Sequence, residues 1–185
     1  MEQDVFTLPE GLTDAAVLPS WEALPDFGLY MDQVITLLDQ YLRFLPADKD
    51  GHIVSASAIN NYVRLKIMPA PVKRKYHRTH LAHLLMILPM KQTVGIADMP
   101  RILPGDADEA ATRSAYEDFS AQFSKSAQFF TEQVHALAQK QGGDGEEAVR
   151  RLAWGCVLVS SFADMLAGQL IGRLPAPAAE EKGKK

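Results

Sequence analysis

Residues 55–88 read SASAINNYVRLKIMPAPVKRKYHRTHLAHLLMIL, and this stretch decides the fold that the sequence predicts. Ser55 and Ser57 can each cap a helix, and the apolar residues that follow them have helical spacing. This helix ends before Pro69, because proline disfavours helical backbone in the residue ahead of it. Residues 72–76 then predict a short basic piece, irregular or two-stranded, and a second apolar helix follows.

The residues before this stretch complete the order of elements. Residues 29–45 have the three-and-four spacing of an amphipathic helix, and residues 48–51 form a turn. A helix, a turn, a short helix and a basic strand-like piece occur in that order in a helix-turn-helix followed by a small wing. We therefore expect a mostly α fold with a winged helix-turn-helix domain at residues 29–105.

Acidic residues are absent from residues 51–97, although the chain as a whole is acidic. This block carries seven lysine and arginine residues, so with a formal net charge of −4 for the whole chain the remaining residues together carry −11. A surface that meets a polyanion gains counterion release for every phosphate that it neutralises, whereas folding alone gains nothing from such segregation. The block also contains His77, His80 and His83, which we expect at the surface, where mild acid would add positive charge.

The pattern indicates a nucleic-acid contact made by two parts of this block. On the short helix, asparagine can read adenine, and arginine can read guanine or a phosphate. The basic residues after Pro71 lie where a wing would meet the phosphate backbone, whereas Lys91 lies apart. We expect the helix at residues 57–65 to enter the major groove. The candidate DNA-binding residues are Ser57, Asn60, Asn61, Tyr62, Arg64, Lys66, Lys73, Arg74, Lys75, Tyr76 and Arg78.

Several blocks that occur in this order resemble the MerR-type winged-helix domain. They are AINNYVR at residues 58–64, RKY at 74–76, HL at 80–81 and GIADM at 95–99. The blocks LYMDQV at 29–34, INNYV at 59–63 and PAPVKRKY at 69–76 are similar, more closely, to an uncharacterised bacterial family of domains of unknown function, number 1836. The resemblance covers about residues 19–103.

The resemblance implies a MerR-like regulator that binds duplex DNA. It places Tyr62, Arg74 and Tyr76 at the positions of the MerR family's backbone-contacting residues. Asn60 and Asn61 stand where that family usually has arginine and tyrosine. Lysine also replaces the family's usual glycine at residue 66, and the wing is shorter than usual.

These features have ordinary alternatives. A run of charges is usually a solvated surface. Tyr62 and Tyr76 can be half-buried core residues with satisfied hydroxyls, and Asn60 and Asn61 fit a helix surface or a cap. The three clustered histidines are spaced three residues apart and have no carboxylate or cysteine nearby, so we expect no metal site.

The rest of the chain predicts a separate unit. Residues 108–141 have the stripe of one long helix, and a glycine-rich turn separates it from a second helix at 146–172. This is the pattern of an antiparallel helical hairpin. The predicted division is an extended arm at 1–28 with Trp21 and Leu24 as core anchors, the DNA-binding domain at 29–105, the hairpin at 106–173 and a disordered tail at 174–185.

The apolar stretch from Leu152 to Ile171 is nearly long enough to cross a bilayer. It contains Asp164, however, and a central carboxylate costs about 2.5–3.5 kcal/mol on membrane-insertion scales. We therefore expect a buried helix of a soluble protein rather than a membrane span. Cys156 is the only cysteine, and we expect it to be a buried, inert thiol.

Sequence motifs for catalysis are missing. The chain has no nucleophile beside a base, no phosphate-cradling glycine loop and no metal-ligand spacing, so we expect neither enzyme activity nor a cofactor. We expect a cytoplasmic regulator that binds double-stranded DNA as a homodimer through the helical hairpin. Two alternatives stay open: a helix-turn-helix module that binds an acidic protein, and a hairpin whose stripe at Phe119, Phe123 and Phe130 holds an unknown small-molecule effector instead of serving core or dimer packing.

Overall fold

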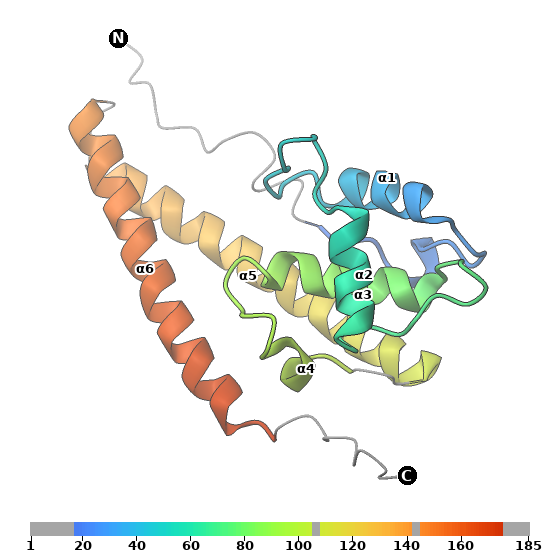
Figure 1. Ribbon diagram of the computed structural model, residues 1–185. Coiled ribbons are helices and arrows are strands. Elements are labelled where there is room, and N and C mark those ends of the chain that lie inside the picture. The colour runs from blue at the N-terminus through green and yellow to red at the C-terminus, as the bar shows by residue number, and fades with distance from the viewer. Residues whose placement is uncertain (1–16, 105–107, 142–144, 176–185) are drawn as a thin grey trace.

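The structure of the protein is a computed structural model that describes residues 17–104, 108–141 and 145–175 (Figure 1). The described residues contain no strand, only two isolated antiparallel bridges. This confirms the predicted mostly α class. The helices are η1 (Trp21–Ala23), α1 (Met31–Tyr41), α2 (Ala56–Arg64), α3 (Arg78–Met90), α4 (Met99–Ile102), α5 (Glu109–Gln141) and α6 (Glu146–Arg173).

Parts of several predicted segments lie outside the described residues. They are the first sixteen residues of the arm, residues 105–107 at the boundary between the two predicted units, the turn residues 142–144, and the tail beyond residue 175. Within the described part of the arm, Trp21 and Leu24 are buried, so their predicted role as core anchors is confirmed.

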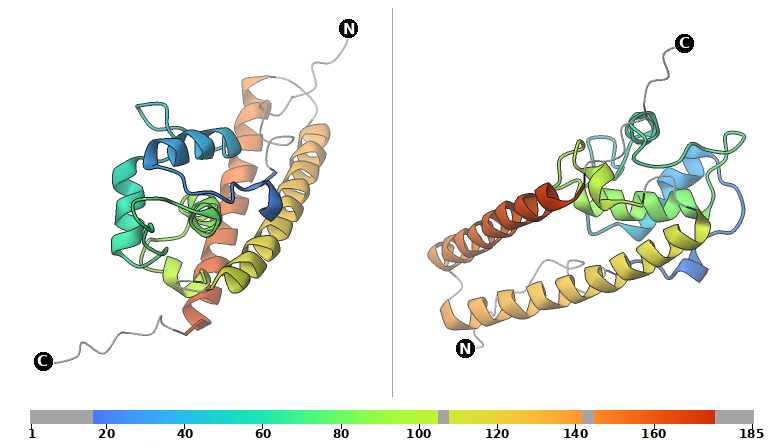
Figure 2. Two further views of the ribbon diagram at one scale, coloured as in Figure 1. Left: turned by 90° about the vertical axis from the view of Figure 1, so that its right-hand side faces the viewer. Right: turned by 90° about the horizontal axis from the view of Figure 1, so that it is seen from below.

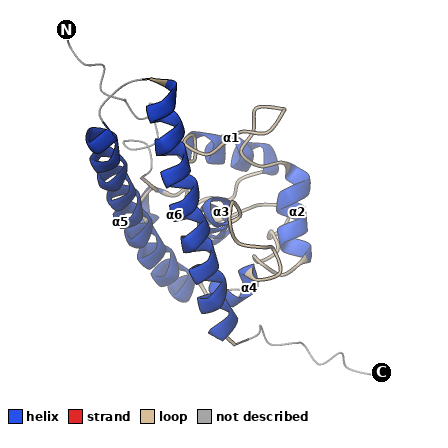
Figure 3. Cartoon of the chain, turned by 90° about the vertical axis from the view of Figure 1, so that its left-hand side faces the viewer, coloured by secondary structure: helices blue, strands red, loops and turns tan. Residues whose placement is uncertain are grey.

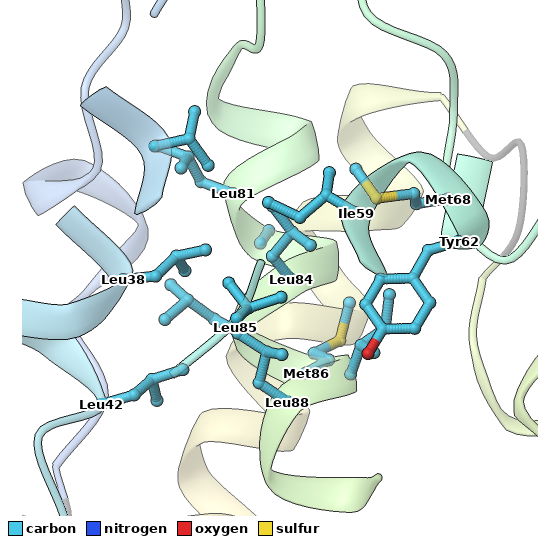
Figure 4. Close-up of a cluster of buried hydrophobic side chains, with 14 of the residues drawn as sticks. Leu38, Leu42, Ile59, Tyr62, Met68, Leu81, Leu84, Leu85, Met86 and Leu88 are labelled. Carbon is cyan, nitrogen blue, oxygen red and sulfur yellow. The ribbon is translucent and has the colours of Figure 1, made fainter. Parts of the chain in front are cut away.

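The helix α3 forms the centre of the fold. Every residue from His80 to Leu88 is buried, so this helix has no exposed side over that length. A helix that is apolar on all sides needs neighbours on all sides, and α1, α2 and α5 surround it (Figure 2). Figure 4 shows Leu38 of α1 and Ile59 and Tyr62 of α2 packed against the leucines of α3.

A long connection joins α1 to α2. The helix α1 ends at Tyr41, four residues earlier than the spacing predicts, and residues 42–55 follow it. The predicted turn is part of this connection, where a carboxylate oxygen of Asp48 accepts hydrogen bonds from the N–H groups of Asp50 (2.9 Å) and His52 (3.0 Å). The connection is therefore longer than the three- or four-residue turn that is typical of a helix-turn-helix motif.

The first part of α5 belongs to the same core as α3. The Tyr116 hydroxyl donates a 2.7 Å hydrogen bond to the carbonyl oxygen of Pro19, and its ring centroid lies 6.2 Å from that of Trp21. Phe119 and Phe123 pack against this core one and two turns further along. The core therefore continues past the boundary that the sequence places at residue 105.

The helix α6 differs from the prediction of a buried helix. Leu152 is its one buried residue, and Cys156 is half-buried. The prediction was wrong because no other described part of the chain covers most of α6. The helices α5 and α6 contact each other but diverge toward the C-terminal end of α6 (Figure 1), and no described element lies in front of α6 in Figure 3. Among the described residues, α6 is the one helix long and apolar enough to cross a membrane.

Candidate nucleic-acid interface

The helix α2 has one buried side and one polar side. Ser55 begins the helix, because its hydroxyl oxygen accepts a 3.3 Å hydrogen bond from the backbone of the first turn. Ile59 and Tyr62 point into the core toward α3 (Figure 4). Asn60 and Arg64 are exposed on the other side. Of these four residues, Asn60 and Arg64 are therefore the two that are accessible to a binding partner.

Two further candidate residues on α2 have local partners. The Arg64 guanidinium donates a 2.6 Å hydrogen bond to the side-chain oxygen of Asn61, which is half-buried. The hydroxyl oxygens of Ser55 and Ser57 lie 2.9 Å apart and share a hydrogen bond. The Asn61 side chain therefore orients Arg64, and Ser57 takes part in the start of the helix.

A two-residue turn at Lys73 and Arg74 carries two adjacent basic side chains. Val72 and Lys75 exchange two backbone hydrogen bonds, with N···O distances of 3.0 Å and 2.9 Å. Between them, Lys73 has a φ of 50° and Arg74 a φ of 65°, the pattern of a type I′ turn. Such turns favour asparagine and glycine, because other residues lose roughly 1–2 kcal/mol in the left-handed conformation. Both side chains are exposed at the tip of the turn.

The turn is tied to the residues that precede α1. Leu29 and Tyr76 form an antiparallel bridge with two backbone hydrogen bonds of 2.8 Å. The Lys75 ammonium lies 5.4 Å from the centroid of the Tyr30 ring, within the range of a cation–π interaction. Gly28 packs against the stem of Lys75, since a Cβ atom at Gly28 would lie 2.8 Å from Lys75 Cδ. The position of the turn is therefore set by long-range contacts.

Three of the predicted contact residues belong to the core instead. Tyr62 and Tyr76 are 6% and 3% exposed, and burial raises the pKa of both phenols. Arg78 is half-buried, and its Nε and Nη2 atoms donate hydrogen bonds of 3.0 Å and 2.9 Å to the carbonyl oxygen of Leu24. Its guanidinium also lies 5.8 Å from the centroid of the Trp21 ring. These three side chains hold the fold together and do not extend the exposed basic region.

The prediction of surface histidines was wrong for two of the three. His80 Nδ1 accepts a 3.0 Å hydrogen bond from the N–H of His77, and Nε2 donates a 3.0 Å bond to the carbonyl oxygen of Ala70. Burial lowers the pKa of His80. His83 is fully buried, with Nδ1 2.8 Å from the carbonyl oxygen of Thr79. Both imidazoles fill core positions of α3 and lie away from the surface.

Five of the eleven candidate DNA-binding residues are both basic and exposed. We call these five the basic surface: Arg64, Lys66, Lys73, Arg74 and Lys75. Figure 1 shows α2 in front of α3 and the following loop projecting past the N-terminal end of α3. Within the described part of the chain, no carboxylate forms an ion pair with Lys73, Arg74 or Lys75. Their charges are therefore not neutralised by the described residues.

Acidic residues on one side and the half-buried Lys91 on another limit the extent of the basic surface. A cleft next to Val72 is lined by Asp26 and Glu109, so acidic groups begin on that side of the turn. Lys91 is half-buried, and its Nζ atom donates a 3.2 Å hydrogen bond to the carbonyl oxygen of Ile53. The basic surface is thus limited to α2, the loop after it and the turn, and Lys91 is not part of it.

Comparison with known protein families gives one match. The family described as Domain of unknown function (DUF1836) matches residues 19–121, which confirms the relationship that the sequence blocks indicate. The matched region contains nearly all of the core, the basic surface and the first part of α5, and it excludes α6. Searches of curated proteins and of solved structures found no match. Because the match spans more than half of the 185 residues, the chain belongs to the DUF1836 family.

Proposed function

We propose that the protein is a DNA-binding regulator that contacts duplex DNA with the basic surface, through a MerR-like winged helix-turn-helix. In this proposal α2 is the recognition helix and residues 72–75 are a minimal wing. The order of α1, α2, turn and α3, with a bridge from Tyr76 back to Leu29, supports this architecture. The long connection between α1 and α2 is a departure from it.

The turn at Lys73 and Arg74 is the observation that carries the proposal. Both residues adopt the left-handed backbone conformation, which is unfavourable for any residue that carries a side chain. Backbone strain of this kind persists where the surrounding structure enforces it, often at functional sites. An unstrained sequence would place asparagine and glycine there. Placing two cations at the tip instead is useful to a protein that meets phosphates, because each neutralised phosphate releases condensed counterions.

The exposed side of α2 provides groups for reading bases. The major groove is about 12 Å wide and admits an α-helix. The Asn60 amide can pair with adenine, and Arg64 can pair with guanine or contact a phosphate. The hydrogen bond from Arg64 to Asn61 holds the guanidinium in place before any DNA binds, which lowers the entropy cost of the contact. The turn at Lys73 and Arg74 would then contact the phosphate backbone of the DNA beside the groove.

Fluorescence anisotropy of a labelled random-sequence duplex tests the proposal. We expect binding at low salt, with a logarithm of affinity that falls linearly with the logarithm of salt concentration. Poly-glutamate of the same total charge serves as the competitor that imitates an acidic protein. Absence of binding at low salt, or equal displacement by poly-glutamate and by unlabelled duplex, would contradict DNA as the partner.

A further inference from the structure

The helix α6 carries a continuous apolar face that no other part of the described chain covers. Large apolar residues recur every four positions along it, which places them on one side of a helix. We call this side the outer face of α6, and it consists of Trp154, Leu158, Phe162, Met165, Leu166 and Leu170. The exposed fractions range from 50% for Leu170 to 67% for Phe162.

The outer face has an area at or above the upper end of what a soluble monomer normally exposes in one apolar patch. Taking about 150–250 Å² for a whole aromatic or long aliphatic side chain, the exposed fractions of its six residues give on the order of 500–850 Å². The largest apolar patch of a typical soluble monomer covers about 300–600 Å². A stable interface of standard size buries about 800 Å² on each partner. The outer face alone therefore supplies most of one partner's share of such an interface.

The distribution of polar residues around α6 favours a protein partner over lipid. Ser160 and Asp164 each lie two positions from Phe162, a rotation of about 200° at 3.6 residues per turn, so they lie on the opposite side of the helix. Asp164 is exposed there. A single membrane-spanning helix meets hydrocarbon all round and would leave this carboxylate in it. An amphipathic helix with one apolar side instead packs that side against another protein surface.

We propose that the outer face of α6 is the interface with a second copy of this chain. Two copies related by a two-fold axis present the same face to each other, so an apolar face needs no different partner to be covered. The proposal assigns the homodimer that the hairpin pattern predicts to one side of one helix. It does not depend on the proposed DNA contact, because the basic surface lies on α2 and the 72–75 turn.

Light scattering after size-exclusion chromatography of the full chain tests this interface. We expect a mass of twice the 20.4 kDa of one chain for the wild-type protein. Phe162→Lys should halve that mass, because it places a charge in the middle of the outer face. Asp164→Lys is the matched control, since it introduces the same residue at an exposed position on the opposite side, and it should remain dimeric.

The possible results separate the occupants of this face. A monomeric wild-type protein, a dimeric Phe162→Lys variant or a monomeric Asp164→Lys variant would each overturn the proposal. Flotation of the wild-type protein with phosphatidylcholine–phosphatidylglycerol vesicles would overturn it in favour of a membrane. Leu158→Lys repeats the test at a second position if Phe162→Lys fails to fold by circular dichroism. Because DNA is absent from these measurements, their outcome is separate from that of the anisotropy experiment.

Discussion

The guanidinium of Arg78 donates two hydrogen bonds to the carbonyl oxygen of Leu24, a residue 54 positions earlier in the chain. This contact joins the segment before α1 to the start of α3, and Trp21 lies against the same guanidinium. An arginine that reads as part of a basic surface in the sequence is therefore a structural residue. The planar guanidinium presents two N–H donors in a fixed arrangement to the Leu24 carbonyl oxygen, which the ammonium group of a lysine does not.

Replacing Arg78 with alanine should destabilise the fold. Hydrogen bonds from charged groups contribute about 1.5–3 kcal/mol each, and partial exposure of this side chain places the expected loss for the pair at the lower end, about 1.5–2 kcal/mol. Arg64→Ala is the control, because exposed substitutions usually stay within about 0.5 kcal/mol. Urea unfolding followed by circular dichroism measures both. Equal stability of the two variants would show that the Leu24 contact does not hold the fold.

A turn with relaxed backbone should be more stable and bind DNA less well. The double variant Lys73→Asn/Arg74→Gly introduces the residue pair that a type I′ turn favours, and relief of the left-handed conformations should raise stability by about 1 kcal/mol. The same change removes two charges from the basic surface, so affinity for duplex DNA should fall. Thermal unfolding measures the change in stability, and fluorescence anisotropy measures the change in affinity for duplex DNA. A variant that is less stable than wild type would refute the assignment of strain.

Stability should fall in mild acid partly because of His80. Its pKa is lowered in the folded protein, while in the unfolded chain it lies near about 6.5. Below that pH the unfolded chain binds the proton more readily than the folded chain, so the free energy of unfolding decreases as the pH falls. Above it, both states are neutral and the contribution is complete.

The variant His80→Gln isolates this effect. It should show a smaller loss of unfolding free energy than the wild type between pH 7.5 and pH 5.5, both values chosen to bracket an ordinary histidine pKa of about 6.5. His52 has the opposite sign, because its hydrogen bond to Asp39 raises its pKa, but it is present in both proteins. An identical pH dependence for the two proteins would exclude His80 as the source.

Gly28 should not tolerate a side chain. A methyl group there would lie 2.8 Å from Lys75 Cδ and 2.9 Å from Lys75 Cβ, so the turn or the lysine must shift. We expect Gly28→Ala to lower the unfolding temperature and to weaken DNA binding. Gly168→Ala is the matched control on α6, where a Cβ atom meets nothing within 4 Å and alanine favours the helix. An unfolding temperature for Gly28→Ala at or above that of the control would show that the contact is not restrictive.

Hydrophobic spacing was sufficient to predict the helices and much of the core. Ile59 and Tyr62, three residues apart, lie on the buried side of α2; the sequence left the core and contact alternatives for Tyr62 equally open, and its burial supports the core alternative. Arg78 could not be assigned in this way, because its partner at Leu24 is distant in the sequence. The same limit applies to His80, whose acceptor Ala70 lies ten residues earlier, between two prolines of an irregular loop.

Two other features could not be predicted in full from the local sequence. The left-handed turn at Lys73 and Arg74 lacks the glycine and asparagine that normally mark such turns, so only the backbone reveals it. The apolar pattern of α6 correctly indicated a helix, but the prediction that this helix is buried was wrong. Spacing alone does not distinguish cover supplied by the same chain from cover supplied by another, and Phe162 is exposed within the chain.

The central claim is that the 72–75 turn contacts the DNA backbone, and the salt dependence of Arg74→Gln/Lys75→Gln tests it most directly. Arg113→Gln/Lys125→Gln is the matched control, since it removes one arginine and one lysine from exposed positions on α5. At about 0.9 units of slope per phosphate contact, the turn variant should lose nearly two units for each protomer bound, on every duplex sequence alike. The control should keep the wild-type slope, and an unchanged slope for the turn variant would contradict the account.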